Sequence, residues 1–233
     1  MAFFYSTQQS PASASKRKKI AIYGAGGLGR EIACLIADIN LQSNVWELVG
    51  FYDDGKAKGP LIDDELPVLG GLEDINSITT PLHLVIAISD PHIKAKLVAS
   101  ITSAFIAYPV LIHPTCQAGN LKYVRIGKGT VVTAGVIMTT HIHLGDFVLV
   151  NLATTIGHDV RVGDFSSIMP SCSISGNVAV GRLTSVGTGA RILQNITLGD
   201  ETIVGAGAIV TKNFGAGSKL IGVPALNILQ PES

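Results

Sequence analysis

Residues 126–210 read IGKGTVVTAGVIMTTHIHLGDFVLVNLATTIGHDVRVGDFSSIMPSCSISGNVAVGRLTSVGTGARILQNITLGDETIVGAGAIV, and this stretch decides the fold. Every sixth residue from Ile126 to Val210 is aliphatic, and a small or β-branched residue recurs with the same step from Thr130 to Ala208. A period of six is neither the period of a helix nor that of a strand. It suits a short strand plus a corner, wound into a three-sided parallel coil of about 18 residues per turn. We predict that both series point inward and that successive coils stack about 4.8 Å apart.

Glycine follows the aliphatic residue in eight of the fifteen hexads. At this position either a tight corner or a close backbone contact excludes a side chain. Before the main series, Ile112, Ala118 and Val124 keep the six-residue step, and the main phase then starts two residues after Val124. We therefore expect a first, irregular coil over residues 112–123.

Length and composition exclude several classes of protein. The chain has 233 residues, of which 47% are hydrophobic and 15% charged, so it is long and apolar enough to bury a sizeable core. Its 17 basic and 17 acidic residues balance, which argues against a nucleic-acid-binding surface. The one basic run, residues 16–19, is interpreted as a solvated approach to the first strand rather than as a membrane or RNA contact.

No apolar run reaches the ~20 residues that a membrane span needs. The apolar patch at residues 2–5 precedes the lysine cluster, which is the wrong order for a secretory signal. The three cysteines, Cys34, Cys116 and Cys172, are too few and too scattered for a disulfide framework or a zinc site. We therefore expect a cytoplasmic protein, with Cys116 and Cys172 as small core residues.

The N-terminal third predicts a strand, a glycine turn and a helix. An apolar strand at residues 19–23 leads into the turn at 24–29, which satisfies G-x-G-x-x-G, and apolar residues at helical spacing follow. A second strand, 46–52, ends in Asp53 and Asp54, and residues 84–88 are predicted to form another parallel strand. Such a turn directs backbone N–H groups and a helix N-terminus towards a phosphate.

Only about 90 residues precede the coil, too few for the two halves that bind a dinucleotide. The motif therefore favours a bound nucleotide diphosphate over NAD, and a purely structural glycine turn remains the alternative. We divide the chain into a tail (1–17), a Rossmann-like nucleotide-sugar-binding domain (18–107), a β-helix domain (108–212) and a C-terminal capping tail (213–233).

The repeat resembles that of the hexapeptide-repeat acyltransferases, whose fold is a left-handed parallel β-helix, and the likeness covers about 113–211. The coil follows a short Rossmann-like domain that has this glycine turn and a strand ending in Asp-Asp. This combination resembles a group of enzymes of bacterial surface glycan synthesis, the sialic acid O-acetyltransferases and nucleotide-amino-sugar N-acetyltransferases. The resemblance implies that the acceptor nucleotide lies near the turn and the acidic pair. The residues so implicated are Gly24, Gly26, Gly27, Asp53 and Asp54. Leu28 departs from the His or Lys that relatives often carry in the turn.

Acetyl transfer from a thioester needs a base, and a neutral histidine suits that role near pH 7. The segment Thr155–Asp159 resembles the family motif in which the histidine is the general base and the next acid polarises it, which assigns these roles to His158 and Asp159. Since His141 precedes Asp159 by one predicted coil, the repeat predicts that it joins them at one edge. There His141 is expected to contact the substrate, and a stacking or interface role is the alternative. His143 is expected beneath Arg161 in a structural role.

The resemblance also implies a homotrimer with acetyl-CoA between adjacent coils. The cofactor contacts so implied are Ser167, Gly187, Gly205, Ala206, Lys212 and Pro224. The alternative for the residues from Gly205 onwards is that they form ordinary final coil turns and a capping loop without any contact to the cofactor. Ser167 stands where some relatives carry a second histidine, which leaves the acceptor class open.

The leading hypothesis is an acetyl-CoA-dependent N-acetyltransferase acting on a UDP- or GDP-linked amino sugar. O-acetylation of a sialic or related sugar is the close alternative. A non-catalytic or metal-dependent hexapeptide protein is a third, but the regular coil offers only His141, His143 and His158 as imidazole ligands, so no metal is expected.

Overall fold

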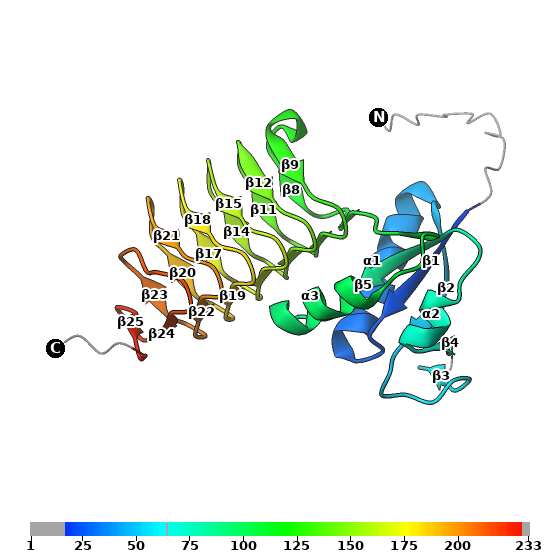
Figure 1. The fold of residues 1–233 in the computed structure, drawn as a ribbon. Coiled ribbons are helices and arrows are strands. Elements are labelled where there is room, and N and C mark those ends of the chain that lie inside the picture. The colour runs from blue at the N-terminus through cyan, green and yellow to red at the C-terminus, as the bar shows by residue number, and fades with distance from the viewer. Residues whose placement is uncertain (1–16, 64, 230–233) are drawn as a thin grey trace, which may run out of the picture.

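The computed structural model describes residues 17–63 and 65–229, which form an N-terminal α/β unit and a long β-coil (Figure 1). The apolar patch at 2–5, Lys16 of the basic run and nearly all of the expected tail lie outside the described residues. None of the described helices is long and apolar enough to cross a membrane.

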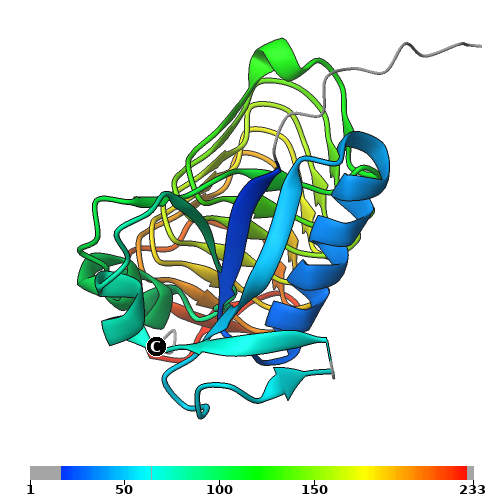
Figure 2. The same ribbon diagram turned by 90° about the vertical axis from the view of Figure 1, so that its right-hand side faces the viewer.

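The N-terminal unit is a six-stranded sheet with helices on both faces. In chain order its elements are β1 (Lys18–Tyr23), α1 (Gly27–Ser43), β2 (Trp46–Tyr52), β3 (Leu61–Ile62), β4 (Leu66–Gly70), α2 (Leu72–Asn76), β5 (Leu82–Ile86), α3 (Pro91–Ser100) and β6 (Ile106–Ala107). The strand order is β3-β4-β2-β1-β5-β6, and the pairs are parallel except β3 with β4. Helix α1 covers one face, and α2 and α3 cover the other (Figure 2).

The expected strand at 84–88 is displaced by two residues. Strand β5 begins at Leu82 because that residue already pairs with Ile106 in β6. It ends at Ile86, which pairs with Tyr23, the last residue of β1. The predicted bounds 84–88 were therefore wrong. The apolar residues continue to Ile88, but β1, the strand that pairs with β5, already ends opposite Ile86.

The coil consists of three parallel sheets. The first sheet holds β7 (Leu111–Ile112), β10 (Val131–Val132), β13 (Leu149–Val150), β16 (Ser167–Ile168), β19 (Ser185–Val186), β22 (Ile203–Val204) and β24 (Lys219–Ile221), with β25 (Leu226–Asn227) antiparallel at its end. The second sheet holds β8 (Gln117–Ala118), β11 (Ile137–Met138), β14 (Thr155–Ile156), β17 (Ser173–Ile174), β20 (Arg191–Ile192) and β23 (Ile209–Val210). The third sheet holds β9 (Val124–Ile126), β12 (Ile142–Leu144), β15 (Arg161–Val162), β18 (Ala179–Val180) and β21 (Thr197–Leu198).

Both inward-pointing series are confirmed. From Val132 to Val210 each aliphatic residue is buried, as is every residue of the second series from Thr130 to Ala208. Leu149 pairs with Ser167, and the same interval, which we call the coil step, recurs through the regular coils. Cys172 is buried and Cys116 is half-buried against the same core, and burial raises the pKa of both thiols.

The glycines after the aliphatic residues allow the backbones of successive coils to approach closely, and they do not form the corners. Positive φ angles fall two residues later in the hexad, at residues such as His141, Asp159 and Asn177, so the left-handed corner lies there. At Gly181, which has no positive φ, a Cβ atom would come within 2.5 Å of the backbone N of Asp200 in the next coil. Of the two explanations for these glycines, the close backbone contact therefore holds.

A substitution at Gly181 tests this packing. We expect Gly181→Ala to lower the free energy of unfolding by about 1–3 kcal/mol, because the methyl group would push neighbouring coils apart. Gly215→Ala is the matched control, since a Cβ there meets nothing within 4 Å. Denaturant titration of both variants measures the difference, and equal stability would contradict the close-contact explanation.

The irregular first coil is confirmed, but the two extra residues lie earlier than expected. Gln117 pairs with Ile137, an interval longer than the coil step by these two residues, whereas Val124 pairs with Ile142 at the ordinary coil step. The insertion therefore falls between Ala118 and Val124. It forms the 3-10 turn Leu121–Tyr123, beyond the outline of the regular coils in Figure 1. Val124 stands beneath Ile142 in the small-residue series, so its predicted place in the aliphatic series was wrong.

The N-terminal unit packs on the outer face of the first sheet. Leu111, Val131 and Leu149 point outward from that sheet into the core formed with β1 and α1. At the adjoining corner, Phe147 stacks on Phe165 with 5.1 Å between ring centroids. These contacts leave the second and third sheets uncovered by the N-terminal unit.

Candidate active site

The corner between β14 and β15 presents His158 and Asp159 to solvent. His158 Nδ1 lies 2.8 Å from Asp159 Oδ2, and both side chains are exposed. When Nδ1 carries the hydrogen donated to the carboxylate, Nε2 keeps the lone pair that a base needs. The left-handed φ of 60° at Asp159 is the corner conformation of this hexad. The repeat thus places both side chains at one corner of the coil. Their arrangement is that of a histidine general base polarised by a carboxylate.

Gly176 makes room for this imidazole. It follows His158 by one coil step, so it occupies the same place in the next coil. A Cβ atom at Gly176 would overlap the His158 ring at Nε2 and Cε1. Sequence reasoning did not single out Gly176, although the coil step could have identified it.

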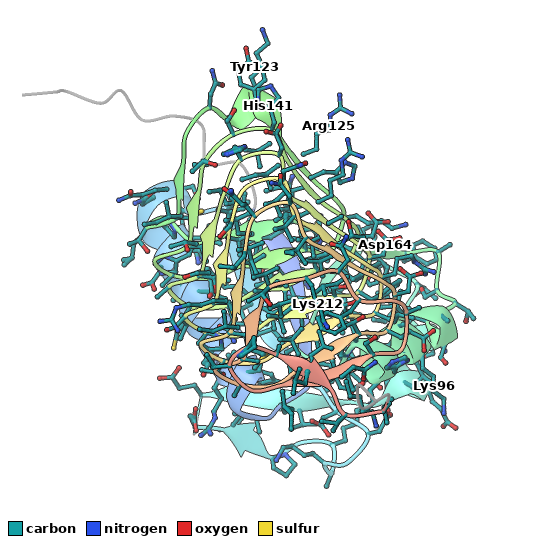
Figure 3. All side chains as sticks on the ribbon, turned by 90° about the vertical axis from the view of Figure 1, so that its left-hand side faces the viewer. Lys96, Tyr123, Arg125, His141, Asp164 and Lys212 are labelled. Atoms are coloured by element: carbon teal, nitrogen blue, oxygen red, sulfur yellow. The ribbon has the colours of Figure 1, made fainter. Side chains whose placement is uncertain are left out.

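His141 occupies the equivalent corner one coil before Asp159, and two neighbours hold its ring. The Thr140 hydroxyl lies 3.0 Å from His141 Nδ1. The ring of Tyr123, carried by the inserted turn, stacks on the imidazole with centroids 4.7 Å apart (Figure 3). Tyr123 was not predicted, because the insertion breaks the period that located the other residues.

A groove of about 940 Å³ runs along the outer face of the third sheet. His141 and Asp159 line it together, as the repeat predicted, whereas His158 lies beside it on the same corner. His143 also lines the groove and pairs in register with Arg161, which places it where the sequence predicted.

The glycine turn borders a second, smaller pocket of about 320 Å³, lined in part by Ala25, Gly26, Arg30 and Lys56. A Cβ atom at Gly26 would meet nothing within 4 Å, so the turn is open on this side. Gly27, also open, begins α1, whose N-terminal N–H groups favour an anion. At Gly24, with φ of 107°, a Cβ atom would come within 2.8 Å of the Ala87 carbonyl oxygen.

Asp53 and Asp54 are engaged with the protein itself. Asp53 accepts hydrogen bonds from the Ala25 N–H at 2.8 Å and the Gly55 N–H at 2.9 Å. Asp54 accepts from the Tyr23 hydroxyl at 2.6 Å and the Leu72 N–H at 2.8 Å. Burial and the bond to Asp54 raise the pKa of Tyr23. Asp53 therefore holds the glycine turn, whereas Asp54 joins the end of β1 to the start of α2.

The expected cofactor residues fall into two groups. Gly187, Gly205 and Ala206 lie at the corners where the first sheet leads into the second, and Pro224 lies between β24 and β25. Lys212 follows β23 and shares the edge of His158, three coils further on. Its ammonium lies 5.7 Å from the centre of the Phe214 ring.

Ser167 is separate from all of these. It points outward from the first sheet, is fully buried, and accepts a hydrogen bond from Lys94 Nζ of α3 at 3.1 Å. This contact between the two units gives a cofactor no access to the Ser167 hydroxyl within this chain. The implied contact with acetyl-CoA therefore does not fit the structure.

Within residues 17–63 and 65–229, no group of three or more His, Cys, Asp and Glu side chains could hold a metal ion. His113 lies at the coil entrance, with Nε2 2.9 Å from Asp38 Oδ2 of α1.

Comparisons with known proteins agree with this architecture. The family described as the PglD N-terminal domain matches residues 19–101. The acetyltransferase domain of PglB from Neisseria gonorrhoeae superimposes with a TM-score of 0.82 at 30% identity, over 91% of this chain and 100% of that one. That domain is also known in complex with acetyl coenzyme A, at 31% identity. No curated protein sequence gave a significant match.

Two further structures are similar. PerB from Caulobacter crescentus, in complex with CoA and GDP-perosamine, has a TM-score of 0.79 and 28% identity, over 93% of this chain and 99% of that one. WeeI from Acinetobacter baumannii has a TM-score of 0.80 and 27% identity, over 91% and 100%. The fold is thus the predicted left-handed parallel β-helix, preceded in the chain by an α/β unit. Together with these matches, it identifies the protein as an acetyltransferase. The chain belongs to the hexapeptide-repeat sugar acetyltransferases.

Proposed function

We propose that this protein transfers the acetyl group of acetyl-CoA to the amino group of a UDP- or GDP-linked amino sugar. The observation that carries the proposal is the exposed His158–Asp159 pair, with 2.8 Å between Nδ1 and Oδ2, beside a groove that His141 also lines. The solved relatives support it, since one is in complex with acetyl coenzyme A and another with CoA and GDP-perosamine.

The proposed reaction needs no acyl-enzyme. The sugar amine attacks the thioester carbonyl carbon, and His158 Nε2 accepts a proton from the amine as the C–N bond forms. A backbone N–H stabilises the oxyanion of the tetrahedral intermediate. Collapse of that intermediate breaks the C–S bond, and the thiolate of CoA leaves with the proton that His158 held. Asp159 orients His158 through Nδ1 and stabilises the charged imidazolium.

The positions of the glycine-turn pocket and His158 favour an active site formed between subunits, and the assembly we propose is a homotrimer. The glycine-turn pocket belongs to the unit that covers the first sheet, whereas His158 lies at the corner between the second and third sheets. These two sites are on opposite sides of one coil. We propose that the acceptor held at Gly24, Gly26 and Gly27 of one subunit reaches His158 of a neighbour, so the active site forms between subunits.

Acetyl-CoA is proposed to lie along the edge that His158 shares with Lys212. Three coil steps separate these residues, about 14 Å at the usual strand spacing, a distance that an extended pantetheine arm can follow. Gly187, Gly205 and Ala206 lie at the other edge of the second sheet, so we propose that they and Pro224 contact the acetyl-CoA that is bound along this edge of a neighbouring subunit. The cytoplasm, a reducing compartment that supplies acetyl-CoA, remains our predicted location.

The acceptor is tested by measuring thiol release from acetyl-CoA with purified protein. A UDP-4-amino sugar, a GDP-4-amino sugar and free sialic acid are offered side by side. We expect turnover with one of the amino sugars and formation of its N-acetyl product. Turnover with sialic acid alone would replace the proposal by O-acetylation, and no turnover with any of the three would contradict it.

A further inference from the structure

Basic side chains are stacked on the outer face of the third sheet. Arg125 pairs in register with His143, and His143 with Arg161, so the three occupy successive coils about 4.8 Å apart. All three are exposed. The matching positions of the second sheet carry Gln117, Ile137 and Thr155 instead. Arg125 and Arg161 thus lie two coils apart on the same face with His143 between them, so this column concentrates positive charge that an anion would neutralise.

The described residues provide no such neutralisation. Among 17–63 and 65–229, no carboxylate lies within 4.0 Å of the charged groups of Lys122, Arg125 or Arg161. The Lys122 ammonium lies instead 5.8 Å from the centre of the Tyr123 ring. These three cations and His143 line the groove of about 940 Å³.

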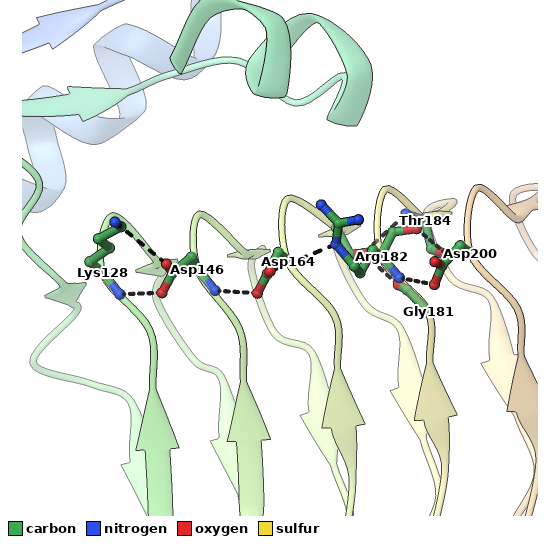
Figure 4. Close-up of polar contacts among 8 residues, drawn as sticks. Lys128, Asp146, Asp164, Gly181, Arg182, Thr184 and Asp200 are labelled. Carbon is green, nitrogen blue, oxygen red and sulfur yellow. Dashed lines mark hydrogen bonds and ion pairs between the residues drawn. The ribbon is translucent and has the colours of Figure 1, made fainter. Parts of the chain in front are cut away.

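The two carboxylates that line the groove already have partners. Asp159 binds His158. Asp164 lies 3.7 Å from Arg182 Nε and accepts the Asp146 N–H at 2.9 Å, as Figure 4 shows. Among the described residues the basic side chains are therefore the groove's unpaired charges, and the groove as built favours an anionic ligand.

The inserted turn places Lys122 and Tyr123 at one end of this groove. Arg125 points away from the coil near Tyr123 and His141 (Figure 3). Asp159 lines the same groove, so a ligand there lies within reach of the proposed catalytic pair. Arginine binds phosphate oxygens in a bidentate manner, and two arginines with a lysine suit a pyrophosphate.

We propose that this groove is a phosphate subsite, in which Arg125, Arg161 and Lys122 bind the pyrophosphate of a substrate of the transfer reaction. The identity of the occupant as a substrate rests on the proposed function. Two substrates carry a pyrophosphate: acetyl-CoA and the nucleotide sugar. If the occupant is the nucleotide sugar, its phosphates lie in this groove rather than at the glycine turn of the neighbouring subunit. If it is acetyl-CoA, its arm runs from His158 towards Arg125 rather than towards Lys212.

Calorimetric titration with inorganic pyrophosphate tests the subsite without any turnover. We expect the unaltered protein to bind pyrophosphate, and Arg125→Gln and Arg161→Gln each to weaken binding about tenfold, because each removes a charged hydrogen-bond donor. Lys96→Gln is the matched control: it removes the same charge from an exposed position on α3, away from the groove (Figure 3), and binding is expected to be unchanged.

Displacement identifies the source of the phosphates. Saturating CoA is expected to abolish pyrophosphate binding if the subsite belongs to the cofactor, and UDP or GDP if it belongs to the acceptor. Absence of pyrophosphate binding, equal binding by the arginine variants, or displacement by neither ligand would overturn the proposal. Each of these results can be obtained whether or not the protein acetylates an amino sugar, so the two proposals fail separately.

Discussion

The His158→Ala variant is expected to lose at least about 100-fold in kcat for acetyl transfer, because a positioned general base contributes typically 10²–10⁴-fold. The KM for acetyl-CoA should change little, since the imidazole acts on the acceptor amine. The side chain is 63% exposed, so its removal should leave the fold and the thermal unfolding midpoint unchanged. Initial rates of thiol release at saturating acceptor provide the measurement.

Two further variants make this result specific. Asp159→Asn keeps the size of the side chain but removes the carboxylate that binds His158 Nδ1, and we expect a smaller loss in kcat than for His158→Ala. His92→Ala removes an exposed histidine from α3, in the other structural unit, and should retain full activity. Retention of activity within a few-fold by His158→Ala would exclude His158 as the base.

The coil could be predicted from the sequence because its interactions repeat. Each inward position meets the same position of the next coil, so one rule constrains Val132, Val150 and Ile168 alike. The same rule, applied to the sequence alone, correctly predicts that His141 and Asp159 share one edge, where the structure has a groove that both line. In a periodic fold, residues that contact each other in successive coils are separated by a fixed number of residues, so these contacts can be predicted from the sequence.

The parts that were wrong or missed lie where the period stops. Between Ala118 and Val124 the number of residues shows that the coil is irregular but not which of them form the inserted turn, so Tyr123 went unnoticed beside His141. The contact of Ser167 with Lys94 joins two units with unrelated patterns, and no sequence interval relates them. Reasoning by resemblance assigned Ser167 to a cofactor, but its surroundings depend on how α3 packs.

Lys94 gives the second large expected effect, on stability rather than on rate. Its side chain, on α3 of the N-terminal unit, is 2% exposed because it is buried against the first sheet of the coil, and its ammonium donates to the Ser167 hydroxyl. Burial lowers the pKa of Lys94 to about 7, with Asp90 opposing the shift. Between pH 7 and about 10 the unfolded chain, with an ordinary lysine pKa, binds one more proton than the folded chain. The free energy of unfolding should therefore rise with pH in this window, by up to about 1.4 kcal/mol per pH unit.

A paired substitution isolates this contribution. In Lys94→Met with Ser167→Ala, neither partner leaves a buried polar group unsatisfied, and the rise between pH 7 and 10 should be lost. Lys96→Met, an exposed lysine on the same helix, should keep it. Denaturant titrations at one protein concentration measure the slope, because association with other copies would otherwise add a concentration-dependent term. Equal slopes for the original chain and the paired variant would mean that Lys94 stays charged where it is buried between α3 and the first sheet. In that case the junction between the two units would have to contain a counter-charge or water that reaches the ammonium.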